Sequence, residues 1–294
     1  MKSVRRLPIL SIIGRYVTAA LTLLIIIVIT RGFSREDLRT YAASLSVAGI
    51  LIWISDLGST NQMVIEIGRG NSQKFTATLA NKLTGTLIGL FVVLIFTSIV
   101  KFTFFSPLLF VGLTVDAFID SIYLVRQVKL STRESVWIPV ARKFSIFLLI
   151  GIYSLANSDL SLKFVIFVYI LICSIFLSLD LYRLRPIKIG LNFSQIVIGA
   201  RIWIQYGGHA LAGLDLFILS GSSYYNSLPL LISSKRISNK LALPATLIGN
   251  RILHDLSEDL VQTEKVIVST RLLRKNLFLI VIPISLIVPY ISLG

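Results

Sequence analysis

Long, almost uninterrupted apolar blocks recur along the whole chain, and they constrain its fold more than any other feature. A helix needs about 20 mostly apolar residues to cross the hydrocarbon core of a bilayer. Nine segments meet this requirement, at 11–30, 41–57, 78–100, 104–125, 136–155, 162–182, 203–221, 230–254 and 277–293. The pattern predicts an all-α polytopic membrane protein with about nine transmembrane helices.

The composition excludes an ordinary soluble domain. Of the 294 residues, 55% are hydrophobic and 15% are charged, and the mean hydropathy is +0.84. Soluble domains are about 45–50% apolar and about 25% charged. The single cysteine, Cys173, excludes an intrachain disulfide, and two isolated histidines, His209 and His254, are too few for a metal cluster. We therefore expect no metal and no cofactor.

The formal net charge of +15 is expected to set the topology rather than to bind nucleic acid. The cations lie mostly between the apolar blocks, and no nucleic-acid-binding motif accompanies them. With a cytoplasmic N-terminus, fifteen lysines and arginines fall in inner segments and five in outer ones. This asymmetry predicts a multi-pass protein whose N-terminus is in the cytoplasm. The first apolar run meets Thr30 and Arg31 instead of a cleavage site, which favours a retained helix over a signal peptide.

The connection at 183–202 predicts a division into two units. It is the longest inner connection, it follows the sixth predicted helix, and it contains Pro186. We expect an N-terminal six-helix bundle at 1–186 and part of a second bundle at 187–294.

The eighth predicted segment carries a stripe of basic residues. On a helical wheel Arg236, Lys240, Arg251 and His254 fall within roughly 60° of one another. Such a stripe is suited to a substrate with phosphate or carboxylate groups, because buried ionisable residues usually face a bundle interior. The alternative is that Arg236 and Arg251 extend to opposite membrane surfaces and that the segment is partly loop.

Two carboxylates share one face of the fourth predicted segment. Asp116 and Asp120 are four residues apart, so they lie one helical turn from each other. Carboxylates this close resist ionising together, and a shared proton would suit a proton- or cation-coupling site. The alternative, weighed equally, is ion pairing with Arg15, Lys82 or another cation across the bundle.

Other polar residues complete the set of candidates. Arg15 lies on a polar face of the first helix, and Asp215 shares a face of the seventh helix with Arg201. Arg142 and Lys143 are expected at the inner end of the fifth helix, and Gly85 and Gly89 are expected at a close helix contact. The predicted substrate-binding residues are Arg15, Lys82, Arg236, Lys240 and Arg251. The predicted ion-coupling residues are Asp116, Asp120 and Asp215.

Several short motifs occur in a characteristic order. They are Gly14-Arg15-Tyr16, the run TRGFSREDL at 30–38, SDLG at 55–58, LDLFIL at 214–219, Tyr224-Tyr225 and Leu243-Pro244. In their order and spacing the chain resembles Wzx-type O-antigen flippases, in the polysaccharide transporter branch of the multidrug/oligosaccharidyl-lipid/polysaccharide exporter superfamily. It departs from that family in having Arg39-Thr40 where a glycine is usual, and in ending in its ninth helix where about twelve are usual.

The sequence contains no P-loop, nucleophile elbow or other catalytic constellation, so we expect that the protein is not an enzyme. The resemblance implies a two-lobed bundle in the bacterial inner membrane. Its substrate would be an oligosaccharide on an undecaprenyl pyrophosphate carrier, translocated by alternating access for O-antigen, capsule or exopolysaccharide assembly. Membrane lipids and other polysaccharide assembly proteins are the further expected partners. Three alternatives stay open: a cation/drug antiporter of the same superfamily, an inactive truncated remnant, and a membrane glycan polymerase.

Overall fold

The computed structural model describes residues 9–56, 59–68, 72–100, 102–122, 131–157, 159–183, 196–197, 214–222, 228 and 231–232. These residues form helices without any strand. The helices are α1 (Ile9–Gly32), α2 (Arg35–Asp56), α3 (Ser59–Gly68), α4 (Ser72–Val100), α5 (Pro107–Ser121), α7 (Thr132–Ala156), α8 (Leu162–Arg183) and α11 (Leu214–Gly221). The predicted segments 230–254 and 277–293 lie almost wholly outside the described residues, as does most of 203–221.

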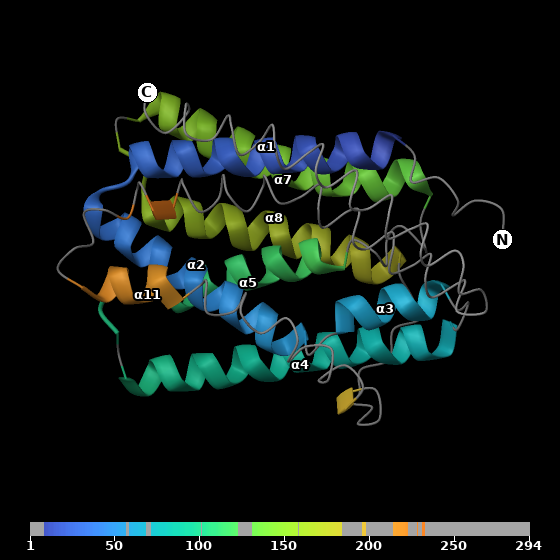
Figure 1. The fold of residues 1–294 in the computed structure, drawn as a ribbon. Helices are drawn as coiled ribbons and strands as arrows, with labels where there is room; N and C mark the ends of the chain where they lie inside the picture. Colours follow the sequence, from blue (N-terminus) through green and yellow to red (C-terminus); the bar gives the residue numbers. More distant parts are fainter. Residues whose placement is uncertain are drawn as a thin grey trace, which may run out of the picture.

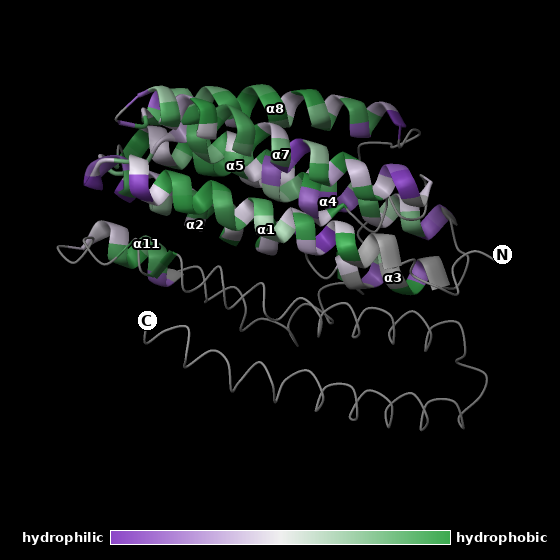
Figure 2. Cartoon of the chain, turned by 90° about the horizontal axis from the view of Figure 1, so that it is seen from above, coloured by the Kyte–Doolittle hydropathy of each residue, from purple (hydrophilic) through white to green (hydrophobic). Residues whose placement is uncertain are grey.

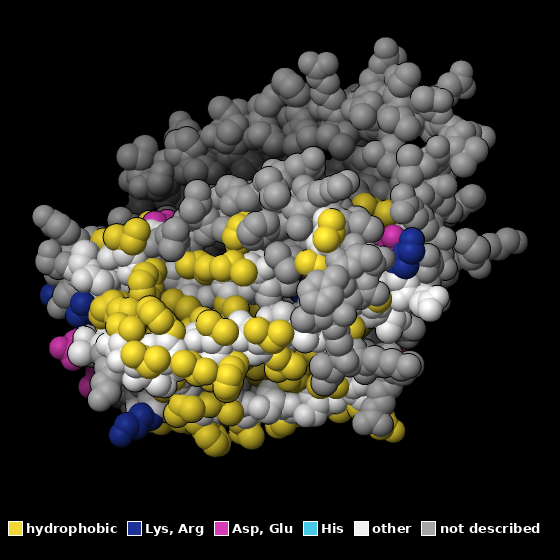
Figure 3. Space-filling view, turned by 90° about the horizontal axis from the view of Figure 1, so that it is seen from below, with side chains coloured by type: hydrophobic (Ala, Val, Ile, Leu, Met, Phe, Trp, Pro, Cys, Tyr) yellow, Lys and Arg dark blue, Asp and Glu magenta, His cyan; other side chains and the backbone are white. Residues whose placement is uncertain are grey.

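Five of these helices are long and apolar enough to cross a membrane. They contain the spans Ile13–Gly32, Arg35–Asp56, Gln73–Val100, Arg133–Ala156 and Leu162–Arg183. On the face seen in Figure 3, apolar side chains cover the middle while charged side chains gather at the two ends. A bilayer imposes this distribution, because its core solvates apolar side chains and excludes charges. The chain is a multi-pass membrane protein.

The long helices lie side by side, and successive long helices along the chain run in opposite directions (Figure 1). Neighbours in space are often distant in sequence, since α1 packs against α7, and α8 packs against both α5 and α7. On the other side of the bundle, α2 contacts α4, α5 and α11, and α3 packs along α4. The helices therefore do not pack as a row of hairpins, because many of the contacts join helices that do not follow one another in the chain.

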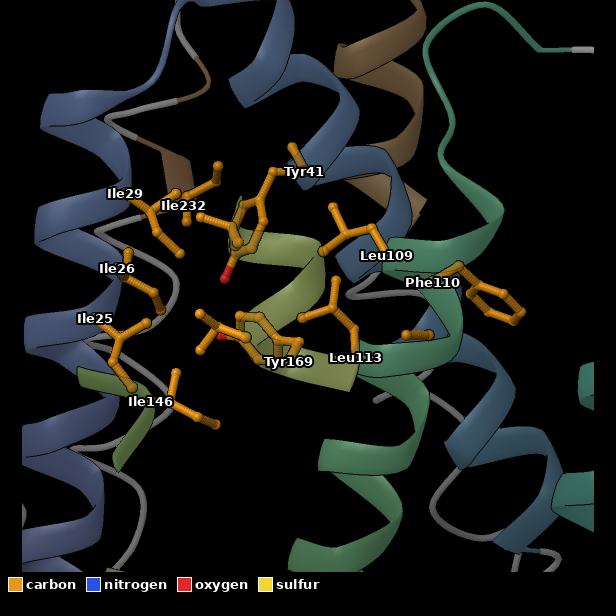
Figure 4. Close-up of a cluster of buried hydrophobic side chains, with 14 of the residues drawn as sticks. Ile25, Ile26, Ile29, Tyr41, Leu109, Phe110, Leu113, Ile146, Tyr169 and Ile232 are labelled. Carbon is orange, nitrogen blue, oxygen red and sulfur yellow. The ribbon is translucent and has the colours of Figure 1, made fainter. Parts of the chain in front are cut away.

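The main hydrophobic cluster lies among α1, α2, α5, α7 and α8 (Figure 4). Ile25 and Ile29 of α1 and Leu109 and Leu113 of α5 are among its buried members. A smaller cluster lies toward the other end of the bundle. It consists of Met63 of α3, Phe75 and Leu79 of α4, Phe118 of α5 and Ile122, which follows α5.

Glycines permit two of the helix contacts. A Cβ at Gly89 would lie 2.3 Å from Leu51 Cδ1, and one at Gly85 would lie 3.3 Å from the Ser55 carbonyl oxygen. The predicted close contact at Gly85 and Gly89 is thus confirmed, with α2 as the partner. A Cβ at Gly14 would lie 2.4 Å from Val136 Cγ1, so α1 and α7 also approach closely at a glycine.

The first six predicted segments are confirmed as helices, with shifted ends. The fourth begins later than predicted, because Ser106 caps α5 and Pro107 occupies its first turn. The short helix α3 was not predicted. The reason is that its buried face includes the polar residues Ser59, Gln62 and Glu66, so it lacks the apolar signal of a spanning segment.

Replacing Gly14 with alanine is expected to destabilise the protein by about 1–3 kcal/mol through overpacking against Val136. Gly151→Ala in α7 is the matched control, since a Cβ there meets nothing within 4 Å. Thermal unfolding in detergent, followed by circular dichroism, measures both. The Val136→Ala change should restore much of the stability of the Gly14→Ala protein. A Gly14→Ala protein as stable as wild type would contradict the close α1–α7 contact.

Candidate functional site

Two carboxylates of α5 and two cations of α7 form a four-charge cluster. Asp116 and Asp120 lie one turn apart on α5, and Arg142 and Lys143 are consecutive on α7. Each cation bridges both carboxylates. Lys143 Nζ lies 2.5 Å from Asp116 Oδ2 and 3.3 Å from Asp120 Oδ2. Arg142 pairs with Asp120 and lies 3.3 Å from Asp116 Oδ1, and it also donates to the Asp116 carbonyl oxygen at 3.0 Å.

The cluster is buried deep along the span. Arg142 and Lys143 follow Thr132, the first residue of α7, by 10 and 11 positions, which corresponds to about 15 Å along the axis. Arg142 is fully buried and the Lys143 side chain is 4% exposed, whereas the Asp120 side chain is 44% exposed. Because the four charges sum to zero, the cluster avoids the free energy cost of an unpaired charge in an apolar medium. The Asp120 carboxylate is the most exposed of the four charged groups.

The cluster also has unused hydrogen-bonding capacity. Arg142 Nε is buried and has no hydrogen-bond partner among the described residues. This guanidinium donor is therefore available to a polar ligand or to water.

A series of polar side chains extends from the four-charge cluster into the main hydrophobic cluster. Cys173 Sγ of α8 lies 3.8 Å from Asp116 Oδ1. One turn earlier on α8, Tyr169 forms a side-chain hydrogen bond with Tyr41 of α2. Figure 4 shows the two phenol groups facing each other inside the main hydrophobic cluster. Polar groups from α2, α5, α7 and α8 thus meet in the bundle interior.

A second buried ion pair lies where α2 ends and α3 begins. Lys82 Nζ of α4 lies 2.5 Å from Asp56 Oδ1 and also donates to Thr60 Oγ1 at 2.7 Å. Asp56 additionally accepts hydrogen bonds from Ser59 Oγ and from the backbone and side chain of Thr60. The carboxylate caps the first turn of α3, so this ion pair joins three helices.

The structure assigns partners to some of the predicted site residues. Asp116 and Asp120 pair with cations, the alternative left open above, and the cations are Arg142 and Lys143. Lys82 pairs with Asp56. Arg15 is half-buried on α1, and Asp215 is exposed in the first turn of α11. Arg236, Lys240 and Arg251 lie outside the described residues, so their common stripe stays a prediction.

Arg142 and Lys143 are the functional candidates that the sequence reasoning placed wrongly. They were expected at the inner end of a helix, but the structure buries them well inside α7. Two adjacent cations in an apolar segment require countercharges, and the preceding segment offers carboxylates one turn apart. This complementary pattern of charges could have predicted the ion pairs from the sequence.

Comparison with models of known protein families, with curated protein sequences and with solved structures gives no match. The candidate site therefore rests on its own geometry. Figure 2 places hydrophilic residues of α1, α4 and α7 within the half of the bundle nearer the N-terminus. The buried ion pairs of Lys82, Arg142 and Lys143 lie in this half, and the larger hydrophobic cluster lies mainly in the other.

Neutralising one member of the four-charge cluster is expected to destabilise the protein by about 3–5 kcal/mol, because its partner would be buried without compensation. Lys143→Met and Asp116→Asn should each have this effect, and the double variant should recover most of the loss. Arg183→Met is the control, since its ion pair with Glu134 is exposed and is expected to contribute less than about 1 kcal/mol.

A double-mutant cycle of unfolding free energies, measured by denaturant titration in micelles, tests this coupling. Strictly additive effects of Lys143→Met and Asp116→Asn would contradict the cluster.

Proposed function

We propose that this chain translocates an undecaprenyl-pyrophosphate-linked oligosaccharide across the bacterial inner membrane, with its N-terminus in the cytoplasm. The four-charge cluster is the observation that carries the proposal. Ionisable groups within spanning helices are costly and usually mark a transport pathway. The resemblance of the sequence motifs to Wzx-type flippases names the substrate class.

The chemistry of the cluster is suited to an anionic ligand. Arg142 and Lys143 already bind carboxylate oxygens, and guanidinium and ammonium groups bind phosphate oxygens by the same hydrogen bonds. A pyrophosphate that approached Lys143 would compete with Asp116 and Asp120 for it. The buried Arg142 Nε donor would give this ligand one further hydrogen bond.

If Arg142 and Lys143 exchanged their carboxylate partners for the pyrophosphate, the buried cations would stay paired throughout translocation. As the pyrophosphate takes over the cations, a proton or small cation would neutralise the released carboxylates. Asp120 is the group best placed to receive it, because its side chain is 44% exposed. The cluster would return to its paired state when the ligand leaves.

A cation/drug antiporter of the same superfamily is the second candidate. The accessible carboxylate of Asp120 favours it, because antiporters of organic cations require an anionic site within reach of the ligand. It differs from the first candidate in the charge of its ligand.

Translocation in proteoliposomes is the decisive measurement. Purified protein is reconstituted with undecaprenyl-pyrophosphate oligosaccharide, and a glycan-modifying enzyme added outside reports the accessible fraction over time. We expect the wild type and Arg183→Met to translocate equally. The Asp116→Asn/Lys143→Met protein should translocate the substrate at least about tenfold more slowly, since it lacks one of the cations that would exchange a carboxylate for the pyrophosphate.

Three results would contradict the proposal: no translocation by the wild type, equal rates in the double variant, or efflux of organic cations driven by a pH gradient in its place. Restoration of surface glycan in a strain that lacks its own flippase extends the test to cells.

A further inference from the structure

Arg39 attaches α11 to the end of the bundle at which α2 begins. Its Nε donates to the carbonyl oxygen of Ser220, in the last turn of α11, and its guanidinium carbon lies 4.9 Å from the ring centroid of Phe104. The last four carbonyls of a helix have no partner within the helix, and the negative end of its dipole attracts a cation. A planar guanidinium can make the hydrogen bond and the ring contact together.

Aromatic rings reinforce this attachment. Phe217 of α11 lies 6.0 Å from Phe104 and 6.2 Å from Phe102, measured between ring centroids. Phe102 and Phe104 belong to the segment that connects α4 to α5. The helix α11 is thus held by α2 on one side and by this connection on the other.

The attachment closes the main hydrophobic cluster. Leu216 of α11 and the later residues Leu228 and Ile232 are buried members of that cluster. Figure 4 places Ile232 between Ile29 of α1 and Tyr41 of α2. Three residues beyond the predicted boundary at 186 therefore complete the main hydrophobic cluster, and we call the contact that they make with α1 and α2 the seam. Arg39 holds the last turn of α11, one turn after Leu216.

We propose that Arg39 is a clamp whose release opens this seam to water at the end of the molecule where α2 begins. The contacts of the clamp are of a kind that can be broken and remade. They are a charge-assisted hydrogen bond, a cation–π contact and a few ring contacts, and each of these is weak on its own. In the carrier proposed above, the clamp would control access from that end.

Thiol labelling tests the clamp without any substrate. In a Cys173→Ala background, Ile232→Cys serves as the reporter of the seam, and Met63→Cys, fully buried in the other cluster, reports general loosening. Each is labelled with a water-soluble maleimide in right-side-out and inverted vesicles. The variants compared are Arg39→Ala, Arg39→Lys and, as a matched loss of charge, the exposed Arg31→Ala at the same end.

We expect Arg39→Ala to raise the labelling rate of Ile232→Cys about tenfold or more, because labelling follows the population of the open state. Arg39→Lys should give a smaller rise, since it keeps the charge but loses the planar group, and Arg31→Ala should give none. Met63→Cys should stay slow throughout.

An unchanged rate in Arg39→Ala would overturn the clamp. An equal rise at Met63→Cys, or rapid labelling of Ile232→Cys with Arg39 intact, would do the same. If Arg39→Ala does not fold, the Arg39→Lys protein decides: a rate equal to that with Arg39 intact overturns the clamp, and a selective rise supports it. Because labelling needs no glycan, a failed clamp and a failed transport assay are separate results.

Discussion

The buried pairing of Asp116 and Asp120 with Arg142 and Lys143 is the constraint on which the rest of this bundle depends. Any one of these charges alone would be costly within a span, and together they are neutral. The pairing fixes α5 relative to α7, and α8 packs against both. A helix that rotated to bring these side chains to its lipid-facing side would expose charge to hydrocarbon. The cluster therefore specifies the orientation of the helices as well as a site.

The interior is divided along its length. Toward the N-terminus lie the buried charges, with Lys82 and Asp56 between α2, α3 and α4 in addition to the four-charge cluster. Toward the other end lies the main hydrophobic cluster, closed by α11 and the residues that follow it. In the proposed carrier, Arg39 and the four-charge cluster would therefore act at different steps, because they lie in different halves of the bundle.

The sequence predicted most of this helical framework because hydropathy is a one-dimensional signal. The sixth segment, 162–182, differs from α8 by a single residue at one end, whereas α3 was missed because its buried face is polar. The faces of helices could also be predicted, as for Asp116 and Asp120. Their partners could not be predicted, because pairing depends on which helices are neighbours, and α7 approaches the cluster through contacts with α1 and α8 that no local pattern encodes. For the same reason, the attachment of α11 through Arg39 was not foreseen.

Infrared spectroscopy of the protein in lipid bilayers tests the central claim most directly, because protonated and ionised carboxyl groups absorb at different frequencies. The difference spectrum of wild type minus Asp116→Asn at neutral pH reports the state of that one group. The account predicts the loss of an ionised carboxylate band, since Asp116 is paired with both Lys143 and Arg142. Loss of a protonated carboxyl band would instead mean that the two aspartates share a proton, and it would contradict the buried ion-pair cluster.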